Sequence, residues 1–239
     1  MPLSSIAGYA EILQDEVGLS ERQLGFADAI ARNAARLTAL THDLLLLSEL
    51  GAGEVHMESQ EVDLRTVVSQ VRDVVMALAA GLHLDVSFDL ADQPVLVVGD
   101  AGHLERVVLN LMGNAIKFSE SGGSVTCRVS VSTSEVILHV TDTGIGIPED
   151  EQPELFTRFF RGSSARHRAI QGTGLGLQIV ASIVANHGGD ITFDSAQGRG
   201  TTVTVRFPRL VPDQLAGRRS DSTSRKAPRA GGQLAEPTA

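Results

Sequence analysis

The chain contains 239 residues, of which 42% are hydrophobic, with a formal net charge of −9 and a single cysteine, Cys127. This size is sufficient for one domain with a large core and a smaller element, whereas the acidic balance argues against a general nucleic-acid-binding surface and one cysteine excludes an internal disulfide. No apolar run approaches the roughly 20 residues that span a bilayer and no signal peptide is apparent, so we expect a cytoplasmic chain without membrane contact of its own, whose longer parent protein could be membrane-anchored.

Residues 1–55 are predicted to form a helical hairpin. Apolar residues from Leu3 to Val17 have helical spacing, Gly18 interrupts the pattern, and Ser20 with Gln23 forms a capping box that begins a second helix. The second helix has a heptad stripe, made of Phe26, Ile30, Asn33, Leu37, Leu40, Leu44 and Leu47. A hairpin of this size cannot bury such a stripe alone, so we expect a homodimer with a four-helix bundle. Packing of the hairpin on the following domain is the alternative.

Residues 61–210 mix helical and strand patterns and are predicted to form a second domain. We expect helices at 64–80 and 101–118, and strands at 84–90, 95–98, 124–132, 135–141, 190–195 and 201–207. Antiparallel strands with helices on one side would make a two-layer α/β sandwich, so the whole chain is predicted to be α+β. The irregular stretch 148–171 is expected to be a mobile lid, and the Ser-, Arg- and Pro-rich residues 211–239 a disordered tail.

The helix expected at 101–118 carries three polar residues on one side. Asn110, Asn114 and Lys117 have i, i+4, i+7 spacing in a segment whose other positions are largely apolar. This spacing aligns two amides and one ammonium, so amide oxygens can reach a hard cation while the ammonium reaches phosphate oxygens. Taken alone, such a stripe is more often a solvated helix face than a binding site.

Two glycine-rich segments follow this helix. The first, DTGIGI at 142–147, comes directly after an expected strand, so Asp142 can accept a hydrogen bond from a base amine while Gly144 and Gly146 let the backbone approach a flat ring. The second, GTGLGL at 172–177, precedes a helical pattern, so its backbone N–H groups can bind phosphates. Turns alone can explain either segment. Neither is a Rossmann fingerprint or a Walker loop, because the βαβ unit and the GK[ST] ending are absent from the sequence.

The order of these motifs resembles the N, G1, F, G2 and G3 boxes of sensor histidine kinases. The asparagine helix is followed by DTGIGI, by LFTRFFRG at 155–162, by GTGLGL and by GRGTT at 198–202. In that family the boxes build an ATP-binding domain that is shared with gyrase B, Hsp90 and MutL. The resemblance therefore implies ATP and Mg²⁺ as cofactors.

The resemblance also assigns roles at the phosphate end of an ATP site. Asn114 would coordinate Mg²⁺, with Asn110 beside it, and Lys117 would contact a phosphate. Arg161 would lie near the γ-phosphate. The loop that would close over the phosphates consists of Gly172, Thr173, Gly174, Leu175 and Gly176.

At the base end, the resemblance assigns Asp142 to the adenine amine. Gly144, Gly146 and Thr201 would shape the pocket around the base. Three histidines, His103, His139 and His187, fit positions in a helix, a strand and a helix end without needing chemistry.

The first residues match only the end of the phosphoacceptor motif of this family. Pro2 and the residues after it resemble the segment that follows the acceptor histidine, which the family pattern puts five positions before Pro2, beside a general-base carboxylate. We therefore expect the acceptor to lie upstream of this chain. His42 is the histidine nearest to that role, but it falls in the expected second helix rather than the first. A misplaced start, a trimmed sequence and a natural partial kinase are the open explanations.

Three functions fit these features. The first is a histidine kinase that transfers the γ-phosphate of ATP to a histidine and onward to an aspartate on a response-regulator receiver domain. The second is an ATP-hydrolysing clamp like gyrase B or MutL, but that class needs a glutamate on the asparagine helix to activate water, and Asn110 occupies that position here. The third, the main alternative, is an ATP-binding partner module without phosphotransfer activity of its own.

Overall fold

The computed structural model describes residues 2–16, 18–52, 59–163, 170 and 172–210. Residues 1–209 form one compact unit. The predicted disordered tail at 211–239 and part of the predicted lid, at 164–169 and 171, lie outside the described residues. None of the described helices combines the length and the apolarity that crossing a bilayer requires.

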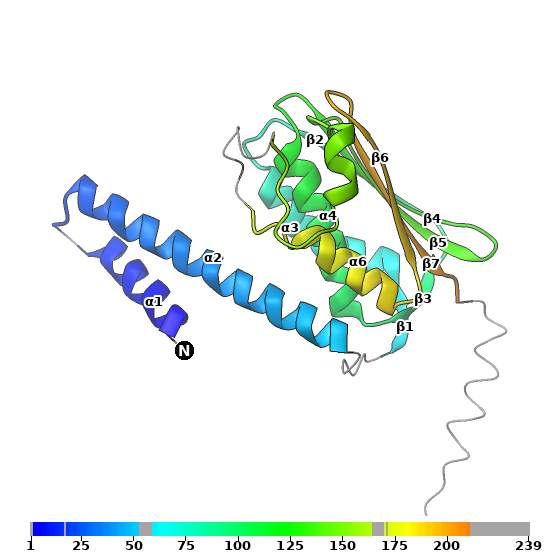
Figure 1. The fold of residues 1–239 in the computed structure, drawn as a ribbon, viewed down its shortest axis with the longest axis horizontal. Helices are drawn as coiled ribbons and strands as arrows, with labels where there is room; N and C mark the ends of the chain where they lie inside the picture. The colour runs from blue at the N-terminus through cyan, green and yellow to red at the C-terminus, as the bar shows by residue number, and fades with distance from the viewer. Residues whose placement is uncertain (1, 17, 53–58, 164–169, 171, 211–239) are drawn as a thin grey trace, which may run out of the picture. The chain divides into compact units, whose positions relative to one another are not determined.

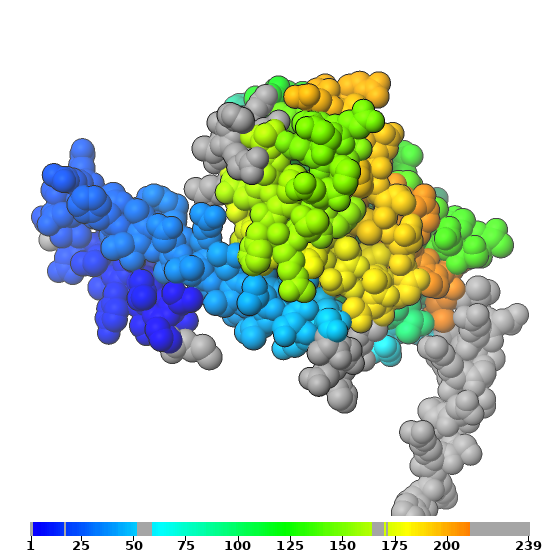
Figure 2. Space-filling view, viewed as in Figure 1, coloured from blue at the N-terminus to red at the C-terminus, as the bar shows by residue number. Residues whose placement is uncertain are grey.

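Two helices form the predicted hairpin, α1 (Pro2–Asp15) and α2 (Glu21–Ala52), which lie against each other (Figures 1 and 2). The capping box is confirmed, because the Ser20 N–H donates to Gln23 Oε1 at 2.9 Å and the Gln23 N–H donates to Ser20 Oγ at 3.4 Å. His42 lies on α2, as predicted. The reciprocal hydrogen bonds between Ser20 and Gln23 thus fix where the second helix begins.

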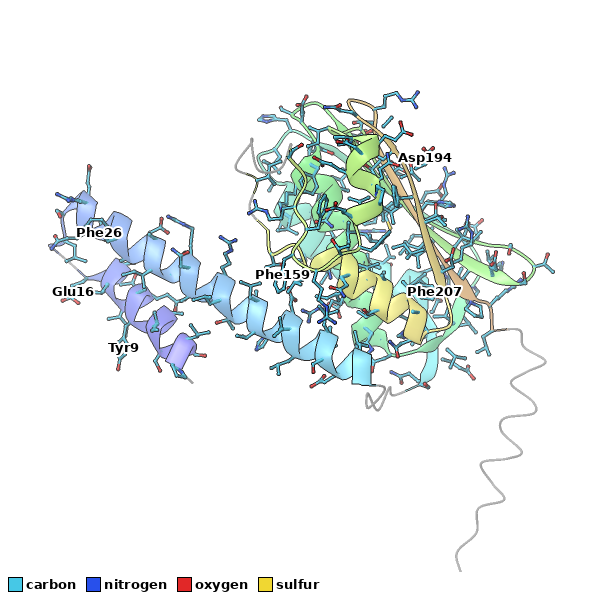
Figure 3. The ribbon with its side chains drawn as sticks, in the orientation of Figure 1. Tyr9, Glu16, Phe26, Phe159, Asp194 and Phe207 are labelled. Atoms are coloured by element: carbon cyan, nitrogen blue, oxygen red, sulfur yellow. The ribbon has the colours of Figure 1, made fainter. Side chains whose placement is uncertain are left out.

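The hairpin exposes much of its apolar surface in the single chain. Tyr9 and Phe26, both labelled in Figure 3, are 69% and 56% exposed. Four apolar positions of the heptad stripe are exposed, namely Phe26, Ile30, Leu37 and Leu44. Near the end of α2 the pattern changes, because Leu47 and Leu50 are buried in the hydrophobic core that also contains α3 and α4. One end of α2 therefore packs on the rest of the unit, while the stripe nearer its start is uncovered.

Beyond the hairpin, five strands form a single sheet with helices on one face (Figure 1). The strands, in spatial order, are β2 (Asp85–Leu90), β4 (Ser124–Val131), β5 (Glu135–Asp142), β7 (Gly200–Pro208) and β6 (Asp190–Ala196). The helices are α3 (Leu64–Ala79), α4 (Ala101–Phe118) and α6 (Gly176–Asn186), and a short 3-10 helix, η1 (Glu149–Glu154), precedes the glycine-rich loop. The α+β class, with helices layered on a sheet, is confirmed.

Strand pairing differs from the prediction in two places. β2 pairs with β4 in parallel, with Val86 opposite Val125, so the expectation of an entirely antiparallel sheet is wrong. Parallel neighbours need a crossover connection, and α4 supplies it here. The strand expected at 95–98 is β3 (Leu96–Gly99), which pairs antiparallel with an unpredicted strand, β1 (Gln60–Asp63), in a separate two-stranded sheet.

The hydrophobic core lies between the sheet and the three helices. Alternate residues of β5 point inward, so Val136, Leu138 and Val140 are buried, while α4 buries Leu104 and Met112 on the facing side. Burial also raises the pKa of the Cys127 thiol to about 12, which keeps it protonated and packed as an apolar residue. This core sets the position of α4 over the sheet.

Candidate functional site

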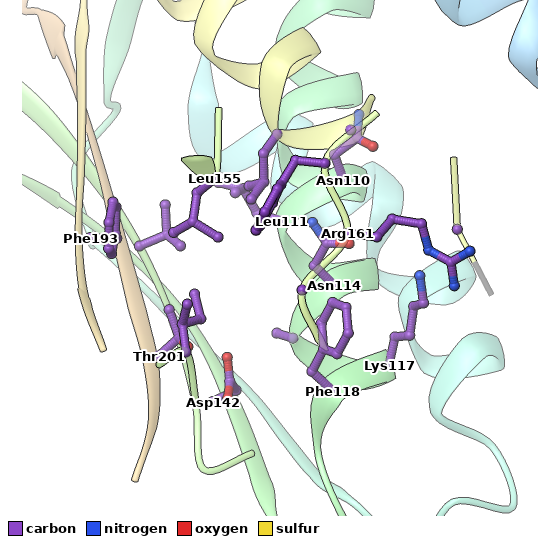
Figure 4. Close-up of a pocket in the computed structure, with 18 of the residues that line it drawn as sticks. Asn110, Leu111, Asn114, Lys117, Phe118, Asp142, Leu155, Arg161, Phe193 and Thr201 are labelled. Atoms are coloured by element: carbon purple, nitrogen blue, oxygen red, sulfur yellow. The ribbon is translucent and has the colours of Figure 1, made fainter. Parts of the chain in front are cut away.

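A cleft of about 380 Å³ lies between α4, the inner face of the sheet and the two glycine-rich segments (Figure 4). A cavity of this size is within the range of small-ligand sites. Asn110, Asn114 and Lys117 project into it from α4, and Asp142 and Thr201 from β5 and β7. The structure therefore brings together residues that are far apart in the sequence.

Local structure at the start of α4 fixes the direction of the asparagine stripe. The Asp100 carboxylate accepts from the His103 N–H at 3.0 Å and so caps the helix. Further along, Asn110 Nδ2 donates to the Arg106 carbonyl at 2.9 Å. This bond directs Asn110 Oδ1 towards Gly176, where the second glycine-rich segment ends. The two are so close that a Cβ added to Gly176 would lie 2.8 Å from Asn110 Oδ1. The amide oxygen is thus the atom that Asn110 offers to the cleft.

Positive charge gathers at one end of the cleft. Lys117 Nζ lies so close to the second glycine-rich segment that a Cβ added to Gly172 would be 2.5 Å from it. Burial, and then the charges of Arg161 and Arg36, lower the pKa of Lys117. Figure 4 shows Lys117 and Arg161 beside each other, and Arg161 Nη2 donates to the Ile170 carbonyl at 2.6 Å. Such a concentration of cations favours a polyphosphate.

A buried carboxylate marks the other end of the cleft. Asp142 is 9% exposed and accepts from the Gly144 N–H at 2.8 Å. Burial raises its pKa, while the hydrogen bonds from the backbone of Gly144 and Thr201 oppose that rise. Gly146 has φ 62°, and a Cβ there would lie 1.9 Å from the Ala196 carbonyl, so only glycine fits this turn. The cleft can therefore hold a flat group against Asp142.

Two predicted site residues lie elsewhere. The Leu175 side chain is fully buried in the core and does not line the cleft, because it occupies the position just before α6 where an apolar side chain packs under the helix. Gly144 does not line the cleft either, and it acts on the site through Asp142. The other predicted residues line the cleft, including Gly146, Arg161, Gly172, Thr173, Gly174 and Gly176.

Sequence reasoning missed the apolar lining of the cleft. Phe118, Phe156, Phe160, Phe193 and Val203 all line it. Phe193 and Val203 are neighbours in the pairing of β6 with β7, and strand alternation puts Phe193 on the same face as Ile191, which packs against the core. This alternation is the feature of the sequence from which the apolar lining at Phe193 could have been predicted. Flat apolar and aromatic surfaces of this kind suit a nucleobase.

Comparison with protein families identifies the class of this domain. Residues 99–211 match the family described as Histidine kinase-, DNA gyrase B-, and HSP90-like ATPase, and residues 1–53 match His Kinase A (phospho-acceptor) domain. The two matches fall on the cleft-bearing region and on the hairpin. The fold and the cleft therefore define an ATP-binding domain of the class shared by these ATPases.

Individual relatives of the chain are sensor histidine kinases. The chain is 40% identical over 209 residues to "Probable sensor histidine kinase TcrY" of Mycobacterium tuberculosis, covering 87% of this chain and 43% of TcrY. It is 36% identical over 210 residues to "Sensor-like histidine kinase SenX3" of Mycobacterium bovis, covering 88% and 51%. The chain thus spans about half the length, or less, of these relatives.

Two solved structures are similar to this chain in fold and sequence. The mycobacterial sensor histidine kinase MprB is 35% identical, with a TM-score of 0.57 over 63% of this chain and 98% of that chain. Full-length ShkA in complex with AMPPNP is 27% identical, with a TM-score of 0.72 over 88% of this chain and 43% of that chain. This chain belongs to the sensor histidine kinase family of two-component systems.

Proposed function

We propose that the chain is the core of an ATP-dependent protein-histidine kinase. It transfers the γ-phosphate of ATP to a histidine of the hairpin region, from which the phosphate passes to an aspartate on a response-regulator receiver domain. The observation that carries this proposal is the cleft, which has a buried carboxylate at one end and amides and cations at the other. Phosphoryl transfer depends mainly on positioning and charge stabilisation, which such an arrangement can supply.

Within the cleft, each end binds a different part of ATP. Asp142 accepts a hydrogen bond from the adenine amine, and the backbone around Gly146 lets the ring approach. Lys117 and Arg161 hold the phosphates, while the loop at 172–176 closes over them. The separation of one carboxylate from a cluster of cations supports this orientation, because the reverse one would bring the phosphates against Asp142.

Magnesium fits the amide oxygens on α4. Mg²⁺ prefers oxygen ligands and is usually held by one or two protein groups together with substrate phosphates. Asn114 would hold it, with Asn110 beside it, and the bound ion would neutralise charge on the phosphates. The bond from Asn110 Nδ2 to the Arg106 carbonyl supports this role, because it leaves the oxygen of that amide towards the cleft.

The hydrolysing-clamp alternative has less support. Two carboxylates line the described part of the cleft, Asp142 and Glu151. Glu151 Oε1 accepts from the Ser163 N–H at 2.9 Å, and Asp142 lies at the base end. Asn110 cannot take a proton from water at neutral pH. Because Asn110 stands where the clamp class needs a glutamate, the described lining of the cleft favours transfer of the phosphate to a side chain over hydrolysis.

The hairpin is proposed to pair with a second copy. The exposed apolar positions Phe26, Ile30, Leu37 and Leu44 on α2 support this, because a four-helix bundle would cover them. The match of residues 1–53 to a phospho-acceptor domain points the same way. A dimer would also bring two hairpins within reach of two ATP sites.

Phosphate labelling tests the transfer reaction. We would incubate the chain, and a form extended upstream through the expected acceptor, with γ-labelled ATP and Mg²⁺. We expect acid-labile, base-stable label on the extended form and none on the chain alone, because none of its seven histidines has the acceptor position. Label on the chain alone that His42→Ala abolishes would identify His42 as the acceptor. Absence of label even on the extended form, with ATP binding intact, would favour the ATP-binding partner module.

A further inference from the structure

A buried histidine joins the two helices whose other parts form the cleft. His187 follows the last residue of α6 and is 8% exposed. Its Nδ1 lies 2.7 Å from the Ile183 carbonyl, and the Asp100 N–H donates to its Nε2 at 3.1 Å. A carbonyl can only accept and a backbone N–H can only donate, so Nδ1 carries the proton and Nε2 carries none. The geometry thus specifies one neutral tautomer.

The imidazole of His187 lies directly on the junction between β3 and α4. A Cβ added to Gly99 would lie 2.2 Å from His187 Cδ2, so the ring occupies the space that any side chain at position 99 would need. Asp100, whose N–H binds the ring, is also the residue that caps α4. The ring therefore joins the end of α6 to the start of α4.

Both joined helices carry the ATP site. α4 bears Asn110, Asn114 and Lys117, and α6 begins at Gly176, where the second glycine-rich segment ends. The two helices contact each other along the core (Figure 1). A change in the angle between them at the His187 end would alter the distance between the asparagine stripe and the phosphate loop at the other end.

Burial opposes the protonation of His187, and its neighbours act in both directions. Burial is the largest cause that lowers its pKa, and the nearby His103 lowers it further, whereas the Ile183 carbonyl and the Asp100 charge raise it. His103 approaches edge-on at 6.1 Å, and its own Nδ1 is buried without a hydrogen-bond partner in the described structure. Phe207 of β7 packs against the ring at 6.1 Å, and β3 contributes Gly99, so neither strand places a titratable side chain on it.

We propose that His187 is a positioning residue for the ATP cleft. It holds the start of α4 against the end of α6 only while its ring is neutral. A proton on Nε2 would face the Asp100 N–H with a second donor, so this hydrogen bond would be lost. The β3–α4 junction would then move away from α6, and ATP affinity would fall as the pH drops below neutral. This inference rests on the ATP site proposed above.

The test compares pH profiles of ATP binding. We would titrate a fluorescent ATP analogue with Mg²⁺ against the chain between pH 8.0 and 5.5, together with His187→Gln and His139→Gln. Glutamine can still accept from the Asp100 N–H but does not titrate. His139, on the opposite face of the sheet, is a matched control because burial also lowers its pKa. We expect the wild-type chain and His139→Gln to lose more affinity towards pH 5.5 than His187→Gln, with a difference that grows at the acid end because burial lowers the pKa of His187.

NMR of the wild-type chain provides a second measurement that does not depend on the folding of His187→Gln. In the wild-type chain labelled with ¹⁵N, His187 should show the Nδ1–H tautomer at pH 8.0, and the Asp100 amide signal should shift with the same midpoint as the loss of affinity. An Nε2–H tautomer, or equal pH profiles for the wild type and His187→Gln, would overturn the proposal. Absence of analogue binding at pH 8.0 would instead contradict the ATP site itself.

Discussion

The Asp142 carboxylate accepts a hydrogen bond from the Gly144 N–H at 2.8 Å, so the loop that follows β5 orients a buried acid at one end of the cleft. Burial nevertheless raises the pKa of Asp142 above its usual 3.8. A carboxyl whose pKa is raised by folding stabilises the fold below pH 3.8, and that stabilisation is lost as the pH rises through the folded-state pKa. At neutral pH the ionised Asp142 therefore costs stability in the ATP-free chain.

Asp142→Asn should raise the stability of the ATP-free chain and at the same time weaken its recognition of adenine. We expect a higher melting temperature without nucleotide, because the buried charge is removed, and weaker ATP binding, because an acceptor for the adenine amine is lost. In the wild type, ATP should outcompete GTP by at least about tenfold, since the guanine carbonyl leaves a buried acceptor unpaired at about 1–3 kcal/mol. Thermal melts and competition against a fluorescent ATP analogue measure both. Asp194→Asn, exposed on β6, is the control, and equal ATP and GTP affinities would contradict this pocket.

Asn114→Ala should weaken binding of Mg-ATP much more than binding of ATP in the presence of a chelator. The substitution removes an oxygen ligand of the cation and leaves the base end unchanged. Titration of a fluorescent ATP analogue with Mg²⁺ and with EDTA gives the two affinities. Asn186→Ala is a matched control, because Asn186 ends α6 and donates to its own helix at the Ser182 carbonyl. Equal affinities of wild type and Asn114→Ala with Mg²⁺ present would refute the assignment.

ATP binding should take up protons at alkaline pH through Lys117. In the free chain, burial and the charges of Arg161 and Arg36 lower the pKa of Lys117 below 10.5. Bound phosphates would raise its pKa again, so Lys117 would hold more of its proton in the complex than in the free chain. Calorimetry at pH 9 in two buffers of different ionisation enthalpy would measure the uptake. Lys117→Met should abolish it, whereas Lys226→Met, which changes a lysine outside the described residues, should not.

Gly146→Ala should both destabilise the chain and abolish ATP binding. Gly146 and Gly198 both have positive φ, but a Cβ at Gly146 would meet the Ala196 carbonyl at 1.9 Å, whereas a Cβ at Gly198 would meet nothing within 4 Å. Gly198→Ala should therefore cost only the left-handed conformation, about 1–2 kcal/mol, and keep ATP affinity. Urea unfolding and binding of a fluorescent ATP analogue, measured on both variants, would distinguish the effect of the left-handed backbone conformation from the effect of the clash with the Ala196 carbonyl. Similar losses in both variants would show that the close approach at Gly146 is unimportant.

Local signals in the sequence predicted the elements that local interactions determine. The asparagine helix was expected at 101–118 and is found there, because Asp100 caps its start and its apolar spacing is unbroken. The Ser20 capping box was equally local. Most residues proposed for the ATP site line one cleft because they belong to motifs that follow strand ends and precede helix starts.

Features that depend on distant partners were not predicted. The parallel pairing of Val86 with Val125 depends on the path of the chain through α4, which no local pattern encodes. Leu175 belongs to a glycine-rich motif, so its fully buried side chain could not be separated from its neighbours by sequence alone. The two hydrogen bonds of His187 join residues 87 positions apart, to Asp100, and four apart, to Ile183.

The uncovered apolar stripe on α2 makes the hairpin sensitive to the amount of protein present. If a second copy covers Phe26, Ile30, Leu37 and Leu44, each hairpin gains stability from association, and by mass action its melting temperature rises with protein concentration. The core of the ATP-binding region lies within one chain and includes only the end of α2, through Leu47 and Leu50, so association affects it less directly. Dilution would therefore unfold the exposed part of the hairpin first, and the proposed nucleotide binding would persist at protein concentrations at which association is lost.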